Sequence, residues 1–208
     1  MPENSRATWP RSLAWVLVPL GAYFLYAHAI PRLAMTEAGY GEYYWDRRGW
    51  LLAHTAAGLL ATLLGPLQFV TRFRASRPDL HRLTGHVYML SVLVAACCAI
   101  VLAVTSQIST SYVAGLLLGA SLWLVTGGIA FSAAHRREFE THRAWMIRNY
   151  AVTFFFIVFF AAYDAAGALG YTDVVAFAGP LVFACLLVPL VLVEAWLRSG
   201  SSPTFGVR

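Results

Sequence analysis

Six long apolar segments constrain the fold of this chain more than any other feature. They cover residues 12–30, 50–73, 83–105, 112–134, 144–169 and 172–197. An α-helix needs about 20 mainly apolar residues to cross the hydrocarbon core of a bilayer, and each segment is close to that length. The connections between them leave no room for a second domain. The sequence therefore predicts an all-α integral membrane bundle of six helices, a single transmembrane domain over residues 1–208.

The composition excludes the main soluble classes of protein. Of 208 residues, 59% are hydrophobic and 12% are charged, whereas a soluble domain has about 25% charged residues. The three cysteines, Cys97, Cys98 and Cys185, lie inside apolar segments and lack the spacing of a disulfide framework. No basic run interleaved with aromatic residues occurs outside the segments' flanks, so the net charge of +5 does not indicate nucleic-acid binding.

The arginines predict the orientation in the membrane. All fifteen basic residues are arginine, and only three, Arg32, Arg47 and Arg48, fall on one side of the six predicted spans. The other side holds twelve: Arg6, Arg11, Arg72, Arg74, Arg77, Arg82, Arg136, Arg137, Arg143, Arg148, Arg198 and Arg208. Arginine-rich connections stay in the cytoplasm, so we expect both termini to be cytoplasmic.

Two further features bear on the arrangement of the spans. The first segment ends in Ala27-His28-Ala29, which also fits a cleavable signal sequence; cleavage would leave five spans. The dipeptide His-Arg occurs at His81-Arg82 and again at His142-Arg143, each time at the cytoplasmic start of a predicted helix. This weak repeat predicts that helices 2 to 5 form a four-helix core, with the first and sixth helices outside it.

Six histidines are the main candidates for chemistry, because an ionisable residue within a membrane span is a functional hypothesis by default. His81, His86, His135 and His142 are expected near the cytoplasmic face, and His28 and His54 toward the outer face. The outer pair, together with Asp164, is an alternative set of ligands for a divalent metal. Histidines beside arginine-rich connections are also common as interfacial residues or helix-end hydrogen-bond partners, and that reading stays open.

A b-type haem requires two imidazoles from different helices at similar depth. We favour His86 with His142 as ligands of the haem iron, with His81 as an alternative to His86 and Met146 as a fallback ligand. His54, with Gly58 one turn later, is a second candidate for the cofactor site, and its partner would be His28. Haem propionates would be neutralised by arginines at the cytoplasmic level: Arg82, Arg143 and Arg148.

The chain also resembles a known family through a set of motifs. These are Gly65-Pro66-Leu67-Gln68-Phe69, Arg72, Pro78, Leu80-His81-Arg82, Gly85-His86-Val87-Tyr88 and the run from His142 to Tyr150. The motifs span roughly residues 50–161. They resemble the bacterial membrane-protein family catalogued as domain of unknown function 2306. The resemblance implies a multi-pass protein of the bacterial inner membrane without an established activity.

A more distant similarity is to six-helix transmembrane b-type cytochromes, whose four central helices hold two haems between histidine pairs. This chain offers the pair between the third and fifth helices, through His86 or His81 and His142. It departs from the pattern at the other pair, because His54 lies at the outer end of the second helix and His135 at the inner end of the fourth. The resemblance implies at most one haem.

Two functional hypotheses follow. In the first, the protein binds haem b and transfers electrons between a quinone or a small reductant and a redox partner in the membrane. In the second, it is a cofactor-free transporter of a small solute or an accessory membrane subunit, with the histidines and Arg148 lining a polar cavity and Gln68 helping to bind the solute. Walker loops, dinucleotide fingerprints and hydrolase motifs are absent from the sequence.

Overall fold

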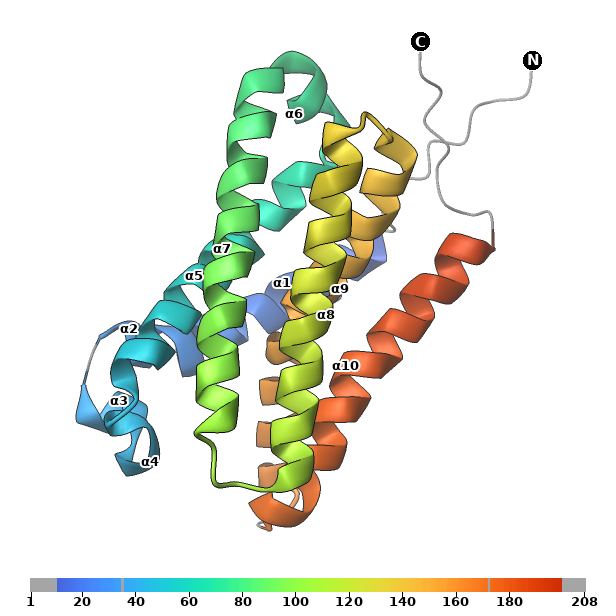
Figure 1. Ribbon diagram of the computed structural model, residues 1–208. Coiled ribbons are helices and arrows are strands. Elements are labelled where there is room, and N and C mark those ends of the chain that lie inside the picture. The colour runs from blue at the N-terminus through green and yellow to red at the C-terminus, as the bar shows by residue number, and fades with distance from the viewer. Residues whose placement is uncertain (1–10, 35, 172, 200–208) are drawn as a thin grey trace.

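The computed structural model describes residues 11–34, 36–171 and 173–199, and every regular element in these ranges is a helix (Figure 1). The long helices are α1 (Arg11–Phe24), α5 (Arg48–Phe69), α7 (Pro78–Val104), α8 (Thr110–His135), α9 (Phe139–Ala168) and α10 (Val174–Arg198). The short ones are the π-helical turn η1 (Leu25–Ala29), α2 (Ile30–Leu33), α3 (Glu37–Tyr40), α4 (Glu42–Trp45) and α6 (Thr71–Ser76). The expected all-α class is confirmed.

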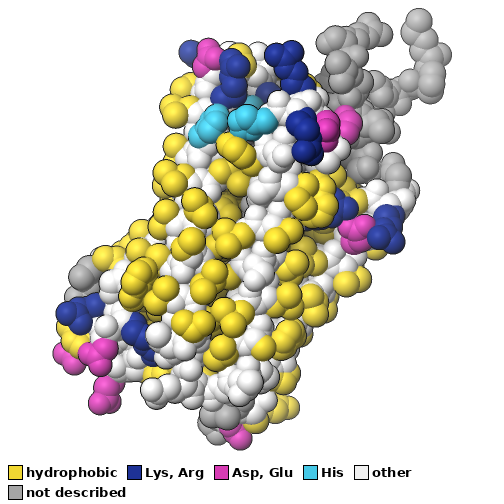
Figure 2. All heavy atoms as spheres, viewed as in Figure 1, with side chains coloured by type: hydrophobic (Ala, Val, Ile, Leu, Met, Phe, Trp, Pro, Cys, Tyr) yellow, Lys and Arg dark blue, Asp and Glu magenta, His cyan; other side chains and the backbone are white. Residues whose placement is uncertain are grey.

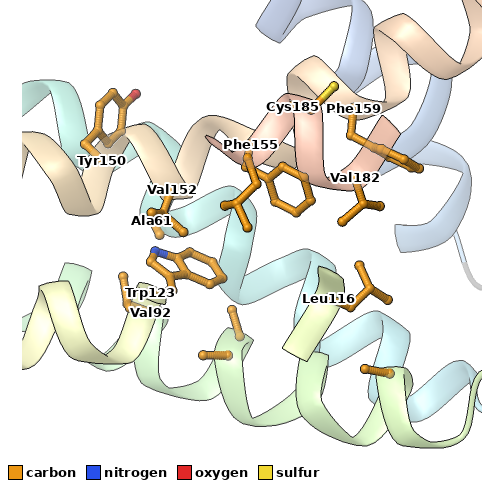
Figure 3. Packing of buried hydrophobic residues seen from close by; sticks show 14 of the residues in the cluster. Ala61, Val92, Leu116, Trp123, Tyr150, Val152, Phe155, Phe159, Val182 and Cys185 are labelled. Carbon is orange, nitrogen blue, oxygen red and sulfur yellow. The ribbon is translucent and has the colours of Figure 1, made fainter. Parts of the chain in front are cut away.

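Four helices form the core of the bundle. Helices α5, α7, α8 and α9 contact one another in a ring, α10 packs outside against α8 and α9, and α1 packs against α9. Buried aromatic and aliphatic side chains fill the space between them, with Trp123 of α8, Phe155 of α9 and Val182 of α10 converging in Figure 3. The second to fifth predicted spans do lie together as expected, but α10 also contributes buried side chains, Val182 and Leu186 among them, to the same core. The expectation that the sixth span lies outside the core is therefore wrong.

Five helices within the described residues are long and apolar enough to cross a membrane. They are Arg48–Phe69, Pro78–Val104, Thr110–His135, Phe139–Ala168 and Ala176–Arg198. Apolar side chains also cover much of the outer surface, while charged side chains gather toward its two ends (Figure 2). A helix with apolar residues on both its core face and its outer face is suited to lipid, so the protein is a multi-pass membrane protein.

The first expected span, residues 12–30, is helical but interrupted. Helices α1, η1 and α2 follow one another without a break from Arg11 to Leu33, and η1 inserts a π-helical turn containing His28. The 14-residue α1 is too short to cross the bilayer by itself. The sixth crossing therefore stays a prediction.

The observed helix bounds correct the expected segment 50–73. Helix α5 ends at Phe69 because Val70 adopts an extended backbone, with φ −79° and ψ 103°. The chain then turns into α6. The sequence becomes polar at this point, with Thr71, Arg72 and Arg74 after Val70, so the expected segment runs past the end of the helix. Elsewhere the helices extend past the apolar segments, as in α9, which begins at Phe139 rather than Ala144.

Small residues allow close approaches between helices. At Gly65 a Cβ atom would collide with the ring of Tyr150, and at Gly115 it would collide with Val182. These contacts join α5 to α9 and α8 to α10. Because lipid tails are as apolar as the helix surfaces, close packing at small residues is a main source of helix association in a membrane.

Candidate functional site

Four histidines line one cavity at one end of the bundle. This end, where α6 and the turn between α8 and α9 lie, is called the arginine-rich end. The cavity has a volume of about 120 Å³. His81 and His86 contribute from α7, His135 from the end of α8 and His142 from the start of α9. We call it the histidine cavity. Figure 2 shows histidines beside the arginines at this end. The structure thus brings together all four histidines that the sequence places in one layer.

Three of these imidazoles are held in the same way. Nδ1 of His86 lies 2.7 Å from the carbonyl oxygen of Arg82, Nδ1 of His135 lies 3.0 Å from that of Phe131, and Nδ1 of His142 lies 2.8 Å from that of Ala130. A carbonyl oxygen only accepts hydrogen bonds, so Nδ1 is the donor in each pair. In the neutral ring, Nε2 then keeps its lone pair.

His81 differs from the other three. Its Nδ1 is buried and has no hydrogen-bond partner among the described residues, although its ring contacts that of Phe73. A buried polar atom without a partner is uncommon in native structures. The histidine cavity therefore contains one imidazole nitrogen whose hydrogen-bonding capacity is not used by any residue that the structure describes.

The arginines expected to neutralise haem propionates have other roles. Arg82 lines the histidine cavity but pairs with Asp79, and both side chains are largely exposed. Arg148 donates from Nε and Nη2 to Oε2 of Glu194, at 3.0 and 2.7 Å, which ties α9 to α10. Arg143 is half-buried near the start of α9. Two of the three expected propionate partners are thus engaged by carboxylates.

The geometry does not fit a haem between His86 and His142. A pocket for a ligand of that size is about 300–1,000 Å³, and the histidine cavity is about 120 Å³. Deeper in the bundle, Tyr88 of α7 and Asn149 of α9 are hydrogen-bonded to each other, so side chains occupy the space between these helices. Among the described residues, no three of the His, Cys, Asp and Glu side chains are grouped to hold a metal ion.

A second cavity, of about 100 Å³, lies between the core helices in the other half of the bundle. Its wall is mostly apolar, with Leu51, Leu116 and Phe156 among its members, and we call it the aromatic chamber. His54 of α5 is part of this wall, with Nδ1 2.9 Å from the carbonyl oxygen of Ala95. By the same argument as above, Nδ1 donates and Nε2 remains for another partner. His54 therefore lies in a different cavity from His81, His86, His135 and His142.

Residues outside the spans cover the far end of this chamber. Arg32 and Tyr44 are part of its wall, and burial raises the pKa of the Tyr44 phenol. Tyr43, beside it, accepts a hydrogen bond from the backbone N–H of Gln107 at 2.9 Å. Burial raises the pKa of Tyr43, but hydrogen bonds with Ser106, Gln107 and Arg47 outweigh burial and lower it overall. These contacts tie α4 to the connection between α7 and α8.

A buried hydrogen-bond network lies between the two cavities. The Tyr88 hydroxyl donates to Oδ1 of Asn149 at 2.7 Å and lies 2.9 Å from Oγ1 of Thr153. Nδ2 of Asn149 donates to Oγ1 of Thr126 and to the Trp123 carbonyl oxygen, each at 2.8 Å, and Nε1 of Trp123 donates to Oγ1 of Thr153 at 2.9 Å. All five side chains are buried. We call them the central network; it joins α7, α8 and α9.

The expected outer metal site is incomplete. His28 and Asp164 do meet, with Nε2 2.7 Å from Oδ2, and the Tyr23 hydroxyl donates to the same oxygen at 2.6 Å. His54 contacts Phe156 instead, and the described residues hold no metal-binding group of three. The pair therefore fastens the π-helical turn of η1 to α9.

Sequence reasoning missed the central network, although two of its members were in view. Tyr88 and Asn149 belong to the motifs that carry the family resemblance, and Asn149 is a polar residue within an apolar segment. Such a residue needs a partner inside the bundle, and this was the signal available. Trp123, Thr126 and Thr153 are ordinary members of apolar helices by composition.

The fold and these cavities define a polytopic α-helical membrane protein with a polar network in its centre. Residues 51–197 match the family model described as "Predicted membrane protein (DUF2306)". Because this match covers most of the chain, the protein belongs to that family. No curated protein and no solved structure matches the chain. The more distant similarity to b-type cytochromes thus gains no support.

Proposed function

We propose that the protein binds a small, weakly polar solute in the aromatic chamber and carries it across the membrane without a cofactor. The observation that carries this proposal is the position of His54. Its Nδ1 is engaged by Ala95 and its ring lines an otherwise largely apolar cavity. A few polar groups in an apolar pocket are typical of small-molecule sites, because they fix the orientation of the ligand.

The size of the chamber limits the solute. A dry cavity of about 150 Å³ accepts benzene, and the aromatic chamber is about 100 Å³. The ligand would therefore have only a few non-hydrogen atoms and one group that hydrogen-bonds with Nε2 of His54. Charged solutes are disfavoured because the chamber offers too little polar surface to replace their hydration.

The central network supports a path between the two cavities. Trp123 and Thr153 belong both to the network and to the chamber wall. On the other side, a Cβ atom at Gly127 would lie 3.0 Å from Cε of Met89, which lines the histidine cavity, and 3.1 Å from Nδ2 of Asn149. The two cavities thus approach the network from opposite sides, and a solute would pass through it.

Two glycines provide a matched test. Gly58 lines the chamber, whereas Gly128 is exposed on α8, and a Cβ atom added at either position meets nothing within 4 Å. The purified protein is screened by thermal unfolding against short-chain alcohols, amides and carboxylic acids. A binding solute raises the melting temperature by mass action. We expect one class to stabilise the wild type and the G128L variant but neither G58L nor H54A.

Transport is then measured in proteoliposomes with the stabilising solute. Uptake by wild type and G128L, together with loss of uptake in G58L, supports the proposal. Equal stabilisation of wild type and G58L by every solute in the panel would refute binding in the chamber. Binding without uptake above that of empty liposomes would refute transport.

The same proposal includes six crossings, with α1, η1 and α2 as the first and both termini in the cytoplasm of a bacterial cell. It is supported by the unequal distribution of arginines and by the uninterrupted helical path from Arg11 to Leu33. Fluorescent-protein fusions, which fluoresce in the cytoplasm but not after export, test it. Fluorescence from both terminal fusions is expected. Termini on opposite sides would require an odd number of crossings.

Haem-dependent electron transfer to a quinone or redox partner stays a prediction from the sequence. The Nδ1 hydrogen bonds of His86 and His142, which leave the Nε2 lone pairs of the neutral rings as acceptors, favour it, and the volume of the histidine cavity opposes it. A reduced-minus-oxidised absorption spectrum of protein expressed with ample haem decides between the two functions. Stoichiometric haem, lost in both H86A and H142A, would replace the cofactor-free proposal.

A further inference from the structure

The wall of the histidine cavity contains sulfur as well as nitrogen. Met89 and Met146 both line it, and they are the two methionines in the part of the chain that the structure describes. The same wall holds four of the six histidines. Thioether and imidazole groups are therefore concentrated around a cavity of about 120 Å³.

The spacing of these residues explains why they share a cavity. On α7, Met89 follows His86 by three positions, and on α9, Met146 follows His142 by four. Residues three or four apart lie on the same face of a helix. Each helix thus presents one imidazole and one thioether toward the same space. Deeper in the bundle, the hydrogen bond between Tyr88 and Asn149 holds α7 and α9 together.

The imidazoles are arranged as metal ligands usually are. A ligating histidine almost always donates its second ring N–H to a carbonyl or carboxylate, which fixes the tautomer and the orientation of the ring. His86 and His142 do this through Nδ1, at 2.7 and 2.8 Å. His81 adds a buried Nδ1 without a partner.

The chemistry of the wall selects the metal. Among the described residues, the wall holds no carboxylate, and it includes the cationic side chain of Arg82. Hard cations such as Mg²⁺ and Ca²⁺ require oxygen ligands. Zn²⁺ takes four tetrahedral ligands from Cys, His and carboxylates, and the described residues contain no group of three such side chains that could hold a metal ion. Thioethers select Cu(I), a monovalent ion that is stable with few ligands.

We propose that the histidine cavity is a Cu(I) site formed by Met89, Met146, His86 and His142. The site lies apart from the aromatic chamber and does not rest on the proposed solute transport. Binding would place a soft cation at the arginine-rich end of α7 and α9, where it links these helices directly. The ligand exchange involves no change of oxidation state, because the ion binds and leaves as Cu(I).

The test is an anaerobic titration of the full-length protein with Cu(I) in competition with a chromogenic chelator. The three free thiols, Cys97, Cys98 and Cys185, also bind Cu(I), so the titration is repeated in a variant in which all three are alanine and whose helix content is checked by circular dichroism. We expect one equivalent of Cu(I) to bind to the variant without cysteines, and any further equivalents in the wild type to belong to the thiols. The volume-conserving variant M89L/M146L should bind roughly tenfold more weakly or worse.

A direct readout uses Ag(I), which has the same charge and softness, and protein labelled at the methionine methyl groups. The NMR signals of Met89 and Met146 should shift on addition of Ag(I), whereas Zn²⁺ should leave them in place. M35L serves as the control for the assignment. Unchanged affinity in M89L/M146L, unshifted methyl signals, or binding that disappears with the cysteines would each overturn the proposal. The G58L variant should keep its Cu(I) affinity, which separates this test from that of solute transport.

Discussion

Replacing Asn149 with leucine tests whether the central network stabilises the bundle. Asn149 is fully buried and makes three hydrogen bonds through its side chain, to Tyr88, Trp123 and Thr126. Its partners keep other contacts: Tyr88 lies within reach of Thr153, and Thr126 donates to the Leu122 carbonyl oxygen. N149L therefore removes three bonds without leaving a buried group unpaired.

The expected cost follows from the number of bonds. Side-chain hydrogen bonds between membrane helices contribute about 0.6 kcal/mol on average, so N149L should lower the free energy of unfolding by about 2 kcal/mol. That corresponds to a roughly 30-fold change in the folding equilibrium. Y88F acts differently, because it leaves Oδ1 of Asn149 buried without a partner, at a cost of about 1–3 kcal/mol.

The double variant makes the prediction specific. Once Asn149 is leucine, loss of the Tyr88 hydroxyl no longer strands an acceptor, so Y88F/N149L should cost less than the two single changes together, by about 0.6 to 1.7 kcal/mol. Reversible unfolding by SDS in mixed micelles measures all three, and Y171F, at an exposed tyrosine, is the control for loss of a phenol. Additive single changes, or N149L as stable as the wild type, would refute the reasoning.

Three other predictions concern single contacts. G65A should lower the free energy of unfolding by about 1–3 kcal/mol because its Cβ collides with the Tyr150 ring. In the same assay G128A, whose Cβ meets open space, should not lower it. Equal effects of the two changes would contradict this packing. D164A should speed hydrogen exchange at Leu25–Ala29 by removing the partner of His28, while D46A leaves it unchanged; protection that survives D164A would argue against this fastening. Because hydrogen bonding lowers the pKa of Tyr43 in the folded state, the folded state gains stability as the pH rises through that pKa. The stability difference between wild type and Y43F should therefore grow from neutral to alkaline pH, and a difference that shrinks would have the wrong sign.

Hydropathy predicts the helices of this protein well because lipid requires them to be long, apolar and hydrogen-bonded internally. It does not predict the break at Val70, where an extended residue separates α5 from α6. Hydropathy also does not predict the π-helical turn of η1 in the first segment. This turn changes the direction in which His28 points, although the residues around it are as apolar as those of a regular helix. Both differences arise from backbone geometry, which residue type does not determine at these positions.

The candidate sites divide in the same way. The depth of a histidine follows from its position in a segment, so the grouping of His81, His86, His135 and His142 could be predicted. The central network could not, because it depends on how α7, α8 and α9 are rotated about their axes. Trp123 and Thr153 share apolar segments with residues that face lipid, such as Val125, which is exposed. Only the packed structure distinguishes them.

The central network joins the stability of the bundle to the proposed transport. It holds α7, α8 and α9 together, and it also separates the aromatic chamber from the histidine cavity. A solute that passes between them must break at least the three hydrogen bonds of Asn149, at the cost of about 2 kcal/mol derived above. A state of that free energy is populated at the level of a few per cent, within the range of minor conformations that proteins visit thermally. The network is therefore strong enough to close the path at rest and weak enough to open without an external source of energy, which is what passive carriage of a small solute requires.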